Sequence, residues 1–262
     1  MKVALIGCGN IGNEIAVYLS NNPAFKIHSL TDVNEKNVDA LKRILIDDVR
    51  VSPLETAIKD ADLIIESANK DVVKQILLSK HIDVKNKKLL VMSTGGLIEN
   101  IDLVNKIKHC EVHVPSGAIA GLDAIMAVAG QINTLTLTTI KSPESLEGSP
   151  YILENKINLL TINKKETIFI GELKDAIKGF PKNINIAASL FLASRFTKIK
   201  IKIIADPSTR FNTHKIVCTG KFGEINIQTT NYPSKNPKTS YLAIQSAISV
   251  LNNMTTNFKI GY

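Results

Sequence analysis

The sequence lacks tryptophan and has only three cysteines among its 262 residues. Cys8, Cys110 and Cys218 lie far apart and show no Cys-x-x-Cys or Cys/His ligand spacing, so we expect neither a disulfide framework nor a metal site. We interpret the thiols as small buried side chains in a reducing compartment. No stretch approaches the roughly 18 apolar residues of a membrane span, and no signal-peptide pattern opens the chain. These absences predict a cytoplasmic protein.

Arginine is scarce as well, although the chain carries a net charge of +8. The positive excess is almost entirely lysine, and it is scattered along the chain. Nucleic-acid surfaces usually combine clustered basic residues with arginine forks or stacking aromatic rings. In the densest basic stretch, 198–204, lysine and isoleucine alternate with period two, which is typical of a strand with one solvated face. We therefore expect no nucleic-acid partner, while the net charge favours anionic substrates.

A glycine motif opens the chain. The apolar stretch "KVALIG" predicts a strand, and the next segment has the apolar spacing of a helix face. Between them, Gly7 permits a tight turn, Gly9 leaves room for a pyrophosphate, and Gly12 allows close packing of helix and strand. Asn10 and Ile11 complete this loop at the start of the helix. The arrangement predicts a dinucleotide-binding domain.

The second predicted strand ends in Asp32, about 20 residues after the glycine turn. A dinucleotide fold places at this position the acid that binds the adenine ribose hydroxyls. An aspartate there repels a 2′-phosphate, which favours NAD over NADP. The alternative is that Asp32 is only a turn residue before the next helix.

Strands and helices alternate through the first part of the chain, which predicts βαβ units and a parallel sheet. Later members of the series are a helix near 71–79, a strand at 87–93, a helix near 99–108 and a strand at 110–116. Ligands of such sheets bind at the carboxyl ends of the strands. Those ends include the turn at 67–69, where Ala68 is a candidate cofactor contact, and the turn at 93–96.

The pattern changes after residue 115. A helix of small residues is expected at 117–130, followed by several Thr- and Ile-rich strands and one helical insert at 180–196. Successive strands indicate a mostly antiparallel sheet. We predict an α/β chain with a Rossmann domain at 1–114 and an α+β substrate domain at 115–237. A final helix within 238–262 is expected to pack back on the first domain.

Five motifs in this order, "GCGNIG", "SGAIAGLDA", "FPKNINIAA", "ADPSTRFNTHKI" and "NPKTS", resemble the L-aspartate dehydrogenase family of NAD biosynthesis. The resemblance implies interconversion of L-aspartate with iminoaspartate or oxaloacetate, using NAD or NADP. It also implies that His214 is catalytic and that Ala118 and Asn185 contact the cofactor. Because the family uses both cofactors, the choice of NAD inferred from Asp32 stays open to NADP.

A histidine suits this chemistry because its unperturbed pKa of about 6.5 allows proton exchange near neutrality. We expect His214 to lie at a domain cleft facing the nicotinamide, with Asn212 either orienting it or capping a turn. His113, near the end of a parallel strand, is the next candidate among the remaining histidines.

Two substrate carboxylates require cationic or N–H partners. The candidates are Lys215, Lys238, Ser116 and Thr239. We expect a small-molecule substrate, a homodimer and no membrane partner. Two alternatives stay open: a dehydrogenase or reductase of the homoserine dehydrogenase or dihydrodipicolinate reductase type, and a non-catalytic NAD(H) sensor.

Overall fold

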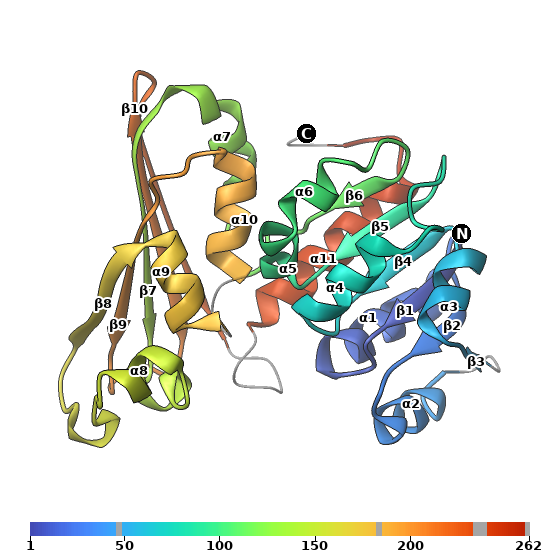
Figure 1. The fold of residues 1–262 in the computed structure, drawn as a ribbon, viewed down its shortest axis with the longest axis horizontal. Coiled ribbons are helices and arrows are strands. Elements are labelled where there is room, and N and C mark those ends of the chain that lie inside the picture. The colour runs from blue at the N-terminus through green and yellow to red at the C-terminus, as the bar shows by residue number, and fades with distance from the viewer. Residues whose placement is uncertain (46–48, 182–184, 233–239, 260–262) are drawn as a thin grey trace. The chain divides into compact units, whose positions relative to one another are not determined.

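A computed structural model describes residues 1–45, 49–181, 185–232 and 240–259, which form two compact units (Figure 1). The first unit comprises Met1–Pro115 together with Ile244–Lys259. The second unit comprises the described residues of Ser116–Ala243. Each unit has its own sheet and is described separately.

The first unit is built on a six-stranded sheet in the order β3-β2-β1-β4-β5-β6. All of its strand pairs are parallel. The order reverses between β1 and β4, and such a reversal is the topological switch point at which doubly wound sheets bind ligands. The predicted Rossmann sheet is therefore confirmed. The strands are β1 (Lys2–Ile6), β2 (Lys26–Thr31), β3 (Arg50–Val51), β4 (Leu63–Glu66), β5 (Lys88–Val91) and β6 (Glu111–His113).

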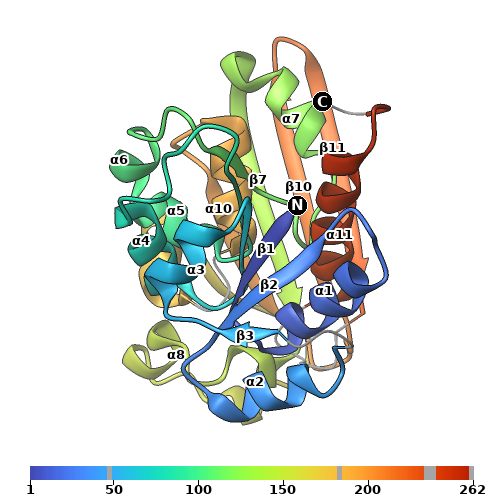
Figure 2. The same cartoon turned by 90° about the vertical axis from the view of Figure 1, so that its right-hand side faces the viewer.

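Helices cover both faces of this sheet (Figure 2). On one face, Ile15 and Leu19 of α1 pack into the same core as Ala247 and Leu251 of α11. On the other face, Ala57 of α3 lies in a small cluster with Ala4 of β1. The helices are α1 (Asn10–Ser20), α2 (Glu35–Lys42), α3 (Leu54–Asp60), α4 (Lys70–Leu78), α5 (Thr94–Glu99), α6 (Ile101–Val104) and α11 (Tyr241–Thr255).

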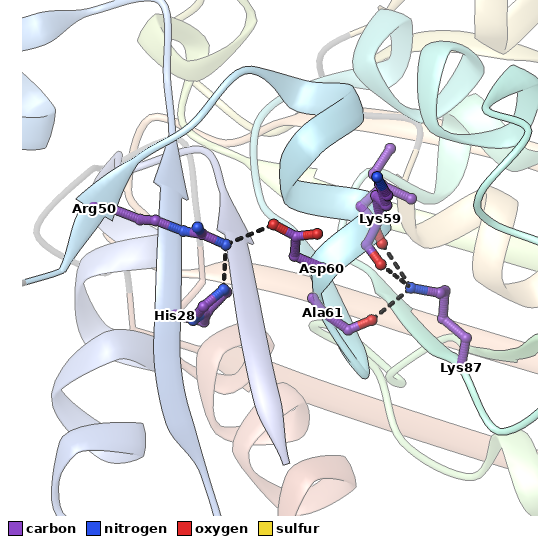
Figure 3. A network of polar contacts seen from close by, with 7 residues as sticks. His28, Arg50, Lys59, Asp60, Ala61 and Lys87 are labelled. Carbon is purple, nitrogen blue, oxygen red and sulfur yellow. Dashed lines mark hydrogen bonds and ion pairs between the residues drawn. The ribbon is translucent and has the colours of Figure 1, made fainter.

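A buried lysine holds the end of α3 against the start of β5 (Figure 3). The Lys87 ammonium donates to the carbonyl oxygens of Ile58 at 2.6 Å and Ala61 at 2.5 Å. Because the last carbonyls of a helix have no partner within the helix, a cation at this end satisfies them. Nearby, Arg50 of β3 contacts His28 and forms an ion pair of 2.7 Å with Asp60. These contacts tie the end of α3 to β3 and to the residue that precedes β5.

The helix predicted near 99–108 is wrong in its bounds. The structure has α5 and α6 instead, separated at Asn100. The Asn100 backbone leaves helical geometry, with φ −125° and ψ 35°, and its side chain donates to the Gly96 carbonyl at 2.8 Å. An asparagine side chain that bonds the backbone competes with helix continuation, which explains the break.

The second unit is built on a five-stranded sheet in the order β11-β10-β7-β9-β8. Among the described strands, three pairs are antiparallel and one, β7 with β9, is parallel. The expectation of a mostly antiparallel sheet is confirmed. The strands are β7 (Ile132–Lys141), β8 (Glu166–Glu172), β9 (Lys200–Ala205), β10 (Asn212–Gly220) and β11 (Gly223–Asn231).

The helices of this unit are α7 (Leu122–Ala127), α8 (Pro150–Glu154), α9 (Leu173–Gly179) and α10 (Asn185–Ser194) (Figure 1). The helix expected at 117–130 is shorter than predicted. Gly117 and Gly121 take left-handed φ values of 68° and 70°, so residues before Leu122 form a loop rather than a helix. Short 3-10 turns follow at Ala129–Gln131, Pro143–Leu146 and Leu159–Thr161.

Successive side chains of each strand point to opposite sides, so the two faces of the second sheet differ. Leu137, Thr139 and Lys141 of β7 line a pocket with Ala176 of α9 and Ala187 of α10, and we call this side of the sheet the covered face. On β9 the isoleucines at 201 and 203 are buried, while Lys200 is exposed and Lys202 half-buried. The predicted alternation of lysines and isoleucines is thereby confirmed.

Candidate active site

The glycine loop has the geometry that its sequence predicts. Gly7 has a φ of +93°, and a Cβ there would lie 2.6 Å from backbone atoms of Ser67 and Ala68. A Cβ on Gly12 would lie 2.0 Å from the Gly7 carbonyl oxygen, so helix and strand approach too closely for any side chain. A Cβ added to Gly9, in contrast, would have no neighbouring atom within 4 Å. The open side of the loop is therefore at Gly9.

This loop leads directly into an 11-residue helix. Gly9 is the N-cap of α1, and it provides no side-chain hydrogen bond to the first turn. Asn10 and Ile11 are the first two residues of the helix. The N–H groups of a first helical turn and the positive end of the helix dipole favour an anion at this place. The loop fits the pyrophosphate of a dinucleotide.

Asp32 follows β2 and contacts the same loop. Its carboxylate accepts hydrogen bonds from the Cys8 N–H at 2.6 Å and from the Asn34 N–H at 2.8 Å. The side chain therefore shapes both the glycine loop and the turn before α2. Burial, with the Asp32 charge in second place, raises the pKa of the Cys8 thiol to about 12, so the thiol stays protonated.

A buried carboxylate that sequence reasoning missed connects the ends of β4 and β5. Glu66 is fully buried and accepts hydrogen bonds from the Ala68 N–H at 2.8 Å, the Ser93 N–H at 2.9 Å and the Ser93 hydroxyl at 2.8 Å. Burial raises its pKa, and these donors oppose the shift. The signal in the sequence is weak: an acid directly follows the apolar run at 63–65.

Hydrogen bonds join the strand ends into one continuous edge. The Gly7 N–H donates to the Thr31 carbonyl at 2.8 Å, and the Ser67 hydroxyl donates to the Gly7 carbonyl at 2.8 Å. The structure thus brings together the cofactor candidates of the first unit, which are Gly7, Gly9, Asn10, Ile11, Gly12, Asp32 and Ala68.

In the second unit, His214 lies on β10 and is only 1% exposed. It is paired with Thr139 of β7, whose hydroxyl lies 3.1 Å from His214 Nδ1. Its imidazole therefore lies on the covered face. Burial first, and repulsion by Lys141 second, lower the pKa of His214 to about 3. The ring is neutral at physiological pH.

Lys141 was not among the residues that the sequence suggested. It is the last residue of β7, two positions after Thr139, and its side chain therefore lies on the same face as the histidine. It is 6% exposed, and burial lowers its pKa to about 8. The covered face thus holds a neutral imidazole and a lysine that is mostly charged at neutral pH.

The structure places two of the predicted substrate residues, Asn212 and Lys215, on opposite faces of the second sheet. Lys215 is exposed and lies on the face opposite to its neighbour His214, because consecutive strand residues alternate. Asn212 shares the histidine's face and is 5% exposed. Ser116 is half-buried at the start of the second unit. Lys238 and Thr239 lie outside the described residues.

The two cofactor contacts implied by the resemblance belong to the second unit. The Ala118 carbonyl accepts from the Thr229 hydroxyl at 2.8 Å and from Asn231 Nδ2 at 2.9 Å, which fastens its loop to β11. Asn185 is the exposed first residue of α10. Helices α7 and α10 pack against each other, so the loop before α7 and the start of α10 belong to one substructure.

The alternative histidine, His113, lies at the end of β6. Its Nε2 is 3.3 Å from a Glu111 carboxylate oxygen, although the two make no hydrogen bond. Burial, followed by the Lys88 charge, lowers its pKa. Within the described ranges we find no group of three His, Cys, Asp or Glu side chains suited to a metal ion. No helix there is both long and apolar enough to cross a membrane.

A Rossmann unit with a glycine loop, together with a mixed-sheet unit that holds a buried histidine, is the arrangement expected of a two-domain, dinucleotide-dependent oxidoreductase. Residues 123–254 match the family described as aspartate dehydrogenase, C-terminal, and residues 1–116 match dihydrodipicolinate reductase, N-terminus. The chain belongs to the L-aspartate dehydrogenase family.

Relatives support this assignment along the whole chain. An L-aspartate dehydrogenase of Methanococcoides burtonii is 37% identical over 274 residues, covering 100% of this chain and 99% of the relative. One from Nitrosopumilus maritimus is 36% identical and covers 95% of each chain. The crystal structure of aspartate dehydrogenase from Thermotoga maritima has the same fold, with a TM-score of 0.77, 24% identity and 99% coverage of both chains.

The glycine loop allows a matched pair of substitutions. Gly9 has φ −75° and ψ −163°, which alanine adopts freely, and the new methyl would face open space. We expect Gly9→Ala to keep the wild-type melting temperature and to weaken NAD binding about tenfold or more. Gly12→Ala, which forces a methyl against the Gly7 carbonyl, should lose about 1–3 kcal/mol of stability. Calorimetry and cofactor titration measure both; unchanged NAD affinity in Gly9→Ala would exclude this loop as the pyrophosphate site.

The lowered pKa of His214 predicts a pH dependence of stability. Between pH values of about 6.5 and about 3, the unfolded chain binds a proton at this histidine that the folded protein does not. The free energy of unfolding should therefore fall with falling pH, by about 1.4 kcal/mol per unit. Between about pH 6.5 and about pH 5, wild type should lose about 2 kcal/mol more than His214→Asn.

Denaturant unfolding at each pH measures this difference, and the other histidines contribute equally to both proteins. Lys141, with a pKa of about 8, keeps its proton throughout this window. Parallel stability curves for the two proteins would show that His214 is not buried in its neutral form.

Proposed function

We propose that this chain is an NAD(P)-dependent L-aspartate dehydrogenase. The observation that carries the proposal is the neutral His214, held by Thr139 on the covered face at the position of the "NTHKI" motif. Similarity to proteins named L-aspartate dehydrogenase over the full chain supports it. The reaction removes a hydride from Cα and a proton from the amino group, and gives iminoaspartate, which water converts to oxaloacetate and ammonia.

The first unit supplies the dinucleotide site. A dinucleotide bound there would supply the acceptor for the hydride from Cα of the substrate. Gly9 leaves room for the pyrophosphate, and the start of α1 offers N–H groups to it. The Asp32 carboxylate beside the loop would accept hydrogen bonds from ribose hydroxyls and repel a 2′-phosphate, which favours NAD over NADP.

His214 supplies the proton chemistry. If Nδ1 donates to the Thr139 hydroxyl, Nε2 carries the lone pair and accepts a proton from the amino group or from the attacking water. A ring with a pKa of about 3 is a weak base on its own. A substrate with two carboxylates adds negative charge beside the ring, which raises its pKa toward neutrality. Substrate binding thereby activates the base.

The remaining expectations belong to the same proposal. We propose Ala118 and Asn185 as further cofactor contacts, and Asn212 and Ser116 as neighbours of the substrate. Lys238 and Thr239 remain candidates for the substrate carboxylates. We also propose a homodimer that works in the cytoplasm.

Turnover of L-aspartate tests the function directly. The protein should reduce NAD when L-aspartate is added and should prefer L-aspartate over L-alanine by about 100-fold or more in kcat/KM, because alanine leaves the cation of the site unmatched. Absorbance of NADH at equal substrate concentrations measures this. Cofactor binding without turnover would instead indicate the NAD(H) sensor, and equal rates with alanine would exclude the dicarboxylate substrate.

Removing the imidazole tests its role. His214→Ala should lower kcat by about 10² to 10⁴, because a positioned acid–base group usually contributes that much. NAD affinity should stay close to wild type, and His214→Asn should be no more active, since an amide does not accept the proton. Single-turnover measurements with a melting curve of each variant distinguish catalysis from packing. A destabilised but fully active His214→Ala would mean that the histidine only fills the core.

A further inference from the structure

Lys141 stands out among the lysines of the second sheet because it points inward. Lys200 and Lys215 are exposed on the opposite face, whereas Lys141 is 6% exposed. Lysine is almost never fully buried in folded proteins, because removing its charge from water is costly. An inward-facing lysine is therefore unusual in this sheet.

The register of the sheet fixes Lys141 close to the candidate base. Thr139, two residues earlier on β7, pairs with His214 and contacts its ring. Repulsion by Lys141 contributes to the lowered pKa of His214, so the two groups lie within electrostatic reach. The Lys141 carbonyl accepts from the Asp206 N–H at 2.8 Å, which anchors the end of the strand.

The pocket that Lys141 lines is mostly apolar. It is otherwise formed by aliphatic side chains, by Thr139 and by Phe180. The Phe180 ring packs against Tyr151 and Phe169, with ring centroids 5.3 and 5.5 Å apart. In such low-dielectric surroundings a cation attracts an anion more strongly than it does in water.

We propose that Lys141 binds a carboxylate of the substrate and thereby sets the specificity for dicarboxylates. This inference rests on the proposed function. His214 is neutral and serves as the base, so it does not supply a positive charge to a substrate carboxylate. Lys215 points to the opposite face, and Lys141 shares the face of the base. The ammonium group of a lysine is a compact charge that can contact either oxygen of a carboxylate. It does not impose the two-pronged geometry of an arginine guanidinium.

The test compares Lys141→Met with Lys141→Gln and with Lys200→Met, a control on the exposed face of the same sheet. We expect both substitutions of Lys141 to raise KM for L-aspartate about 100-fold while KM for NAD stays within about twofold. The preference for L-aspartate over L-alanine should fall by a similar factor. Lys200→Met should behave as wild type.

Succinate has the two carboxylates of aspartate but no amino group, so the enzyme cannot oxidise it to an imine. Its binding therefore gives a readout that does not depend on turnover. Succinate should inhibit wild type competitively with L-aspartate and raise its melting temperature. Both effects should be lost in Lys141→Met and retained in Lys200→Met. Because methionine is close to lysine in length and suits the mostly apolar lining of the pocket, we expect Lys141→Met to fold, and Lys141→Gln provides a second test.

The outcomes separate this inference from the proposed function. If wild type oxidises L-aspartate and Lys141→Met or Lys141→Gln keeps the wild-type KM for it, the inference is wrong and the function stands. A lowered kcat with an unchanged KM also overturns it, because Lys141 would then only position His214. If succinate binding depends on Lys141 but L-aspartate is not oxidised, the carboxylate site stands and the proposed function fails.

Discussion

The contact between Thr139 and His214 reports the strand register on which the arrangement of the covered face depends. It exists because β7 and β10 pair in one antiparallel register, which places the hydroxyl 3.1 Å from the imidazole. A slip of one residue would turn His214 outward and bring Lys215 inward, since strand side chains alternate. The same register fixes Lys141 on the covered face. The chemistry of this face is thus a consequence of strand pairing.

The two units would contribute different chemical groups to the proposed reaction. Along the first sheet, backbone N–H groups donate to carboxyl side chains: Asp32 binds the glycine loop, and Glu66 binds the turns after β4 and β5. These carboxylates fix the backbone that a dinucleotide would contact. The second sheet instead provides a lone pair and a cation in apolar surroundings. In the proposed hydride transfer, the first unit would bind the dinucleotide, and the second unit would supply the base and the cation for the substrate.

The sequence predicted the features that depend on local pattern. Gly7, Gly9 and Gly12 were predicted from spacing, and their steric roles follow from contacts within one turn. The sheets, and the identity of the family, also follow from sequence patterns. Glu66 and Lys141 were missed because their importance depends on burial and on neighbours in other strands, which no local pattern records. The helix break at Asn100 and the loop before α7 likewise depend on backbone conformations at single residues. Lys215 lies next to His214 in sequence, yet it faces the other way.

The most direct test of this account is an NMR titration of the His214 imidazole, assigned by comparison with His214→Asn. In the free protein, the ring should stay neutral from about pH 8 down to about pH 5, because burial and Lys141 lower its pKa to about 3. Adding succinate should raise the pKa of His214, since the dicarboxylate brings negative charge to the covered face. A ring that titrates near its ordinary value of about 6.5 in the free protein, and that does not respond to succinate, would contradict the account.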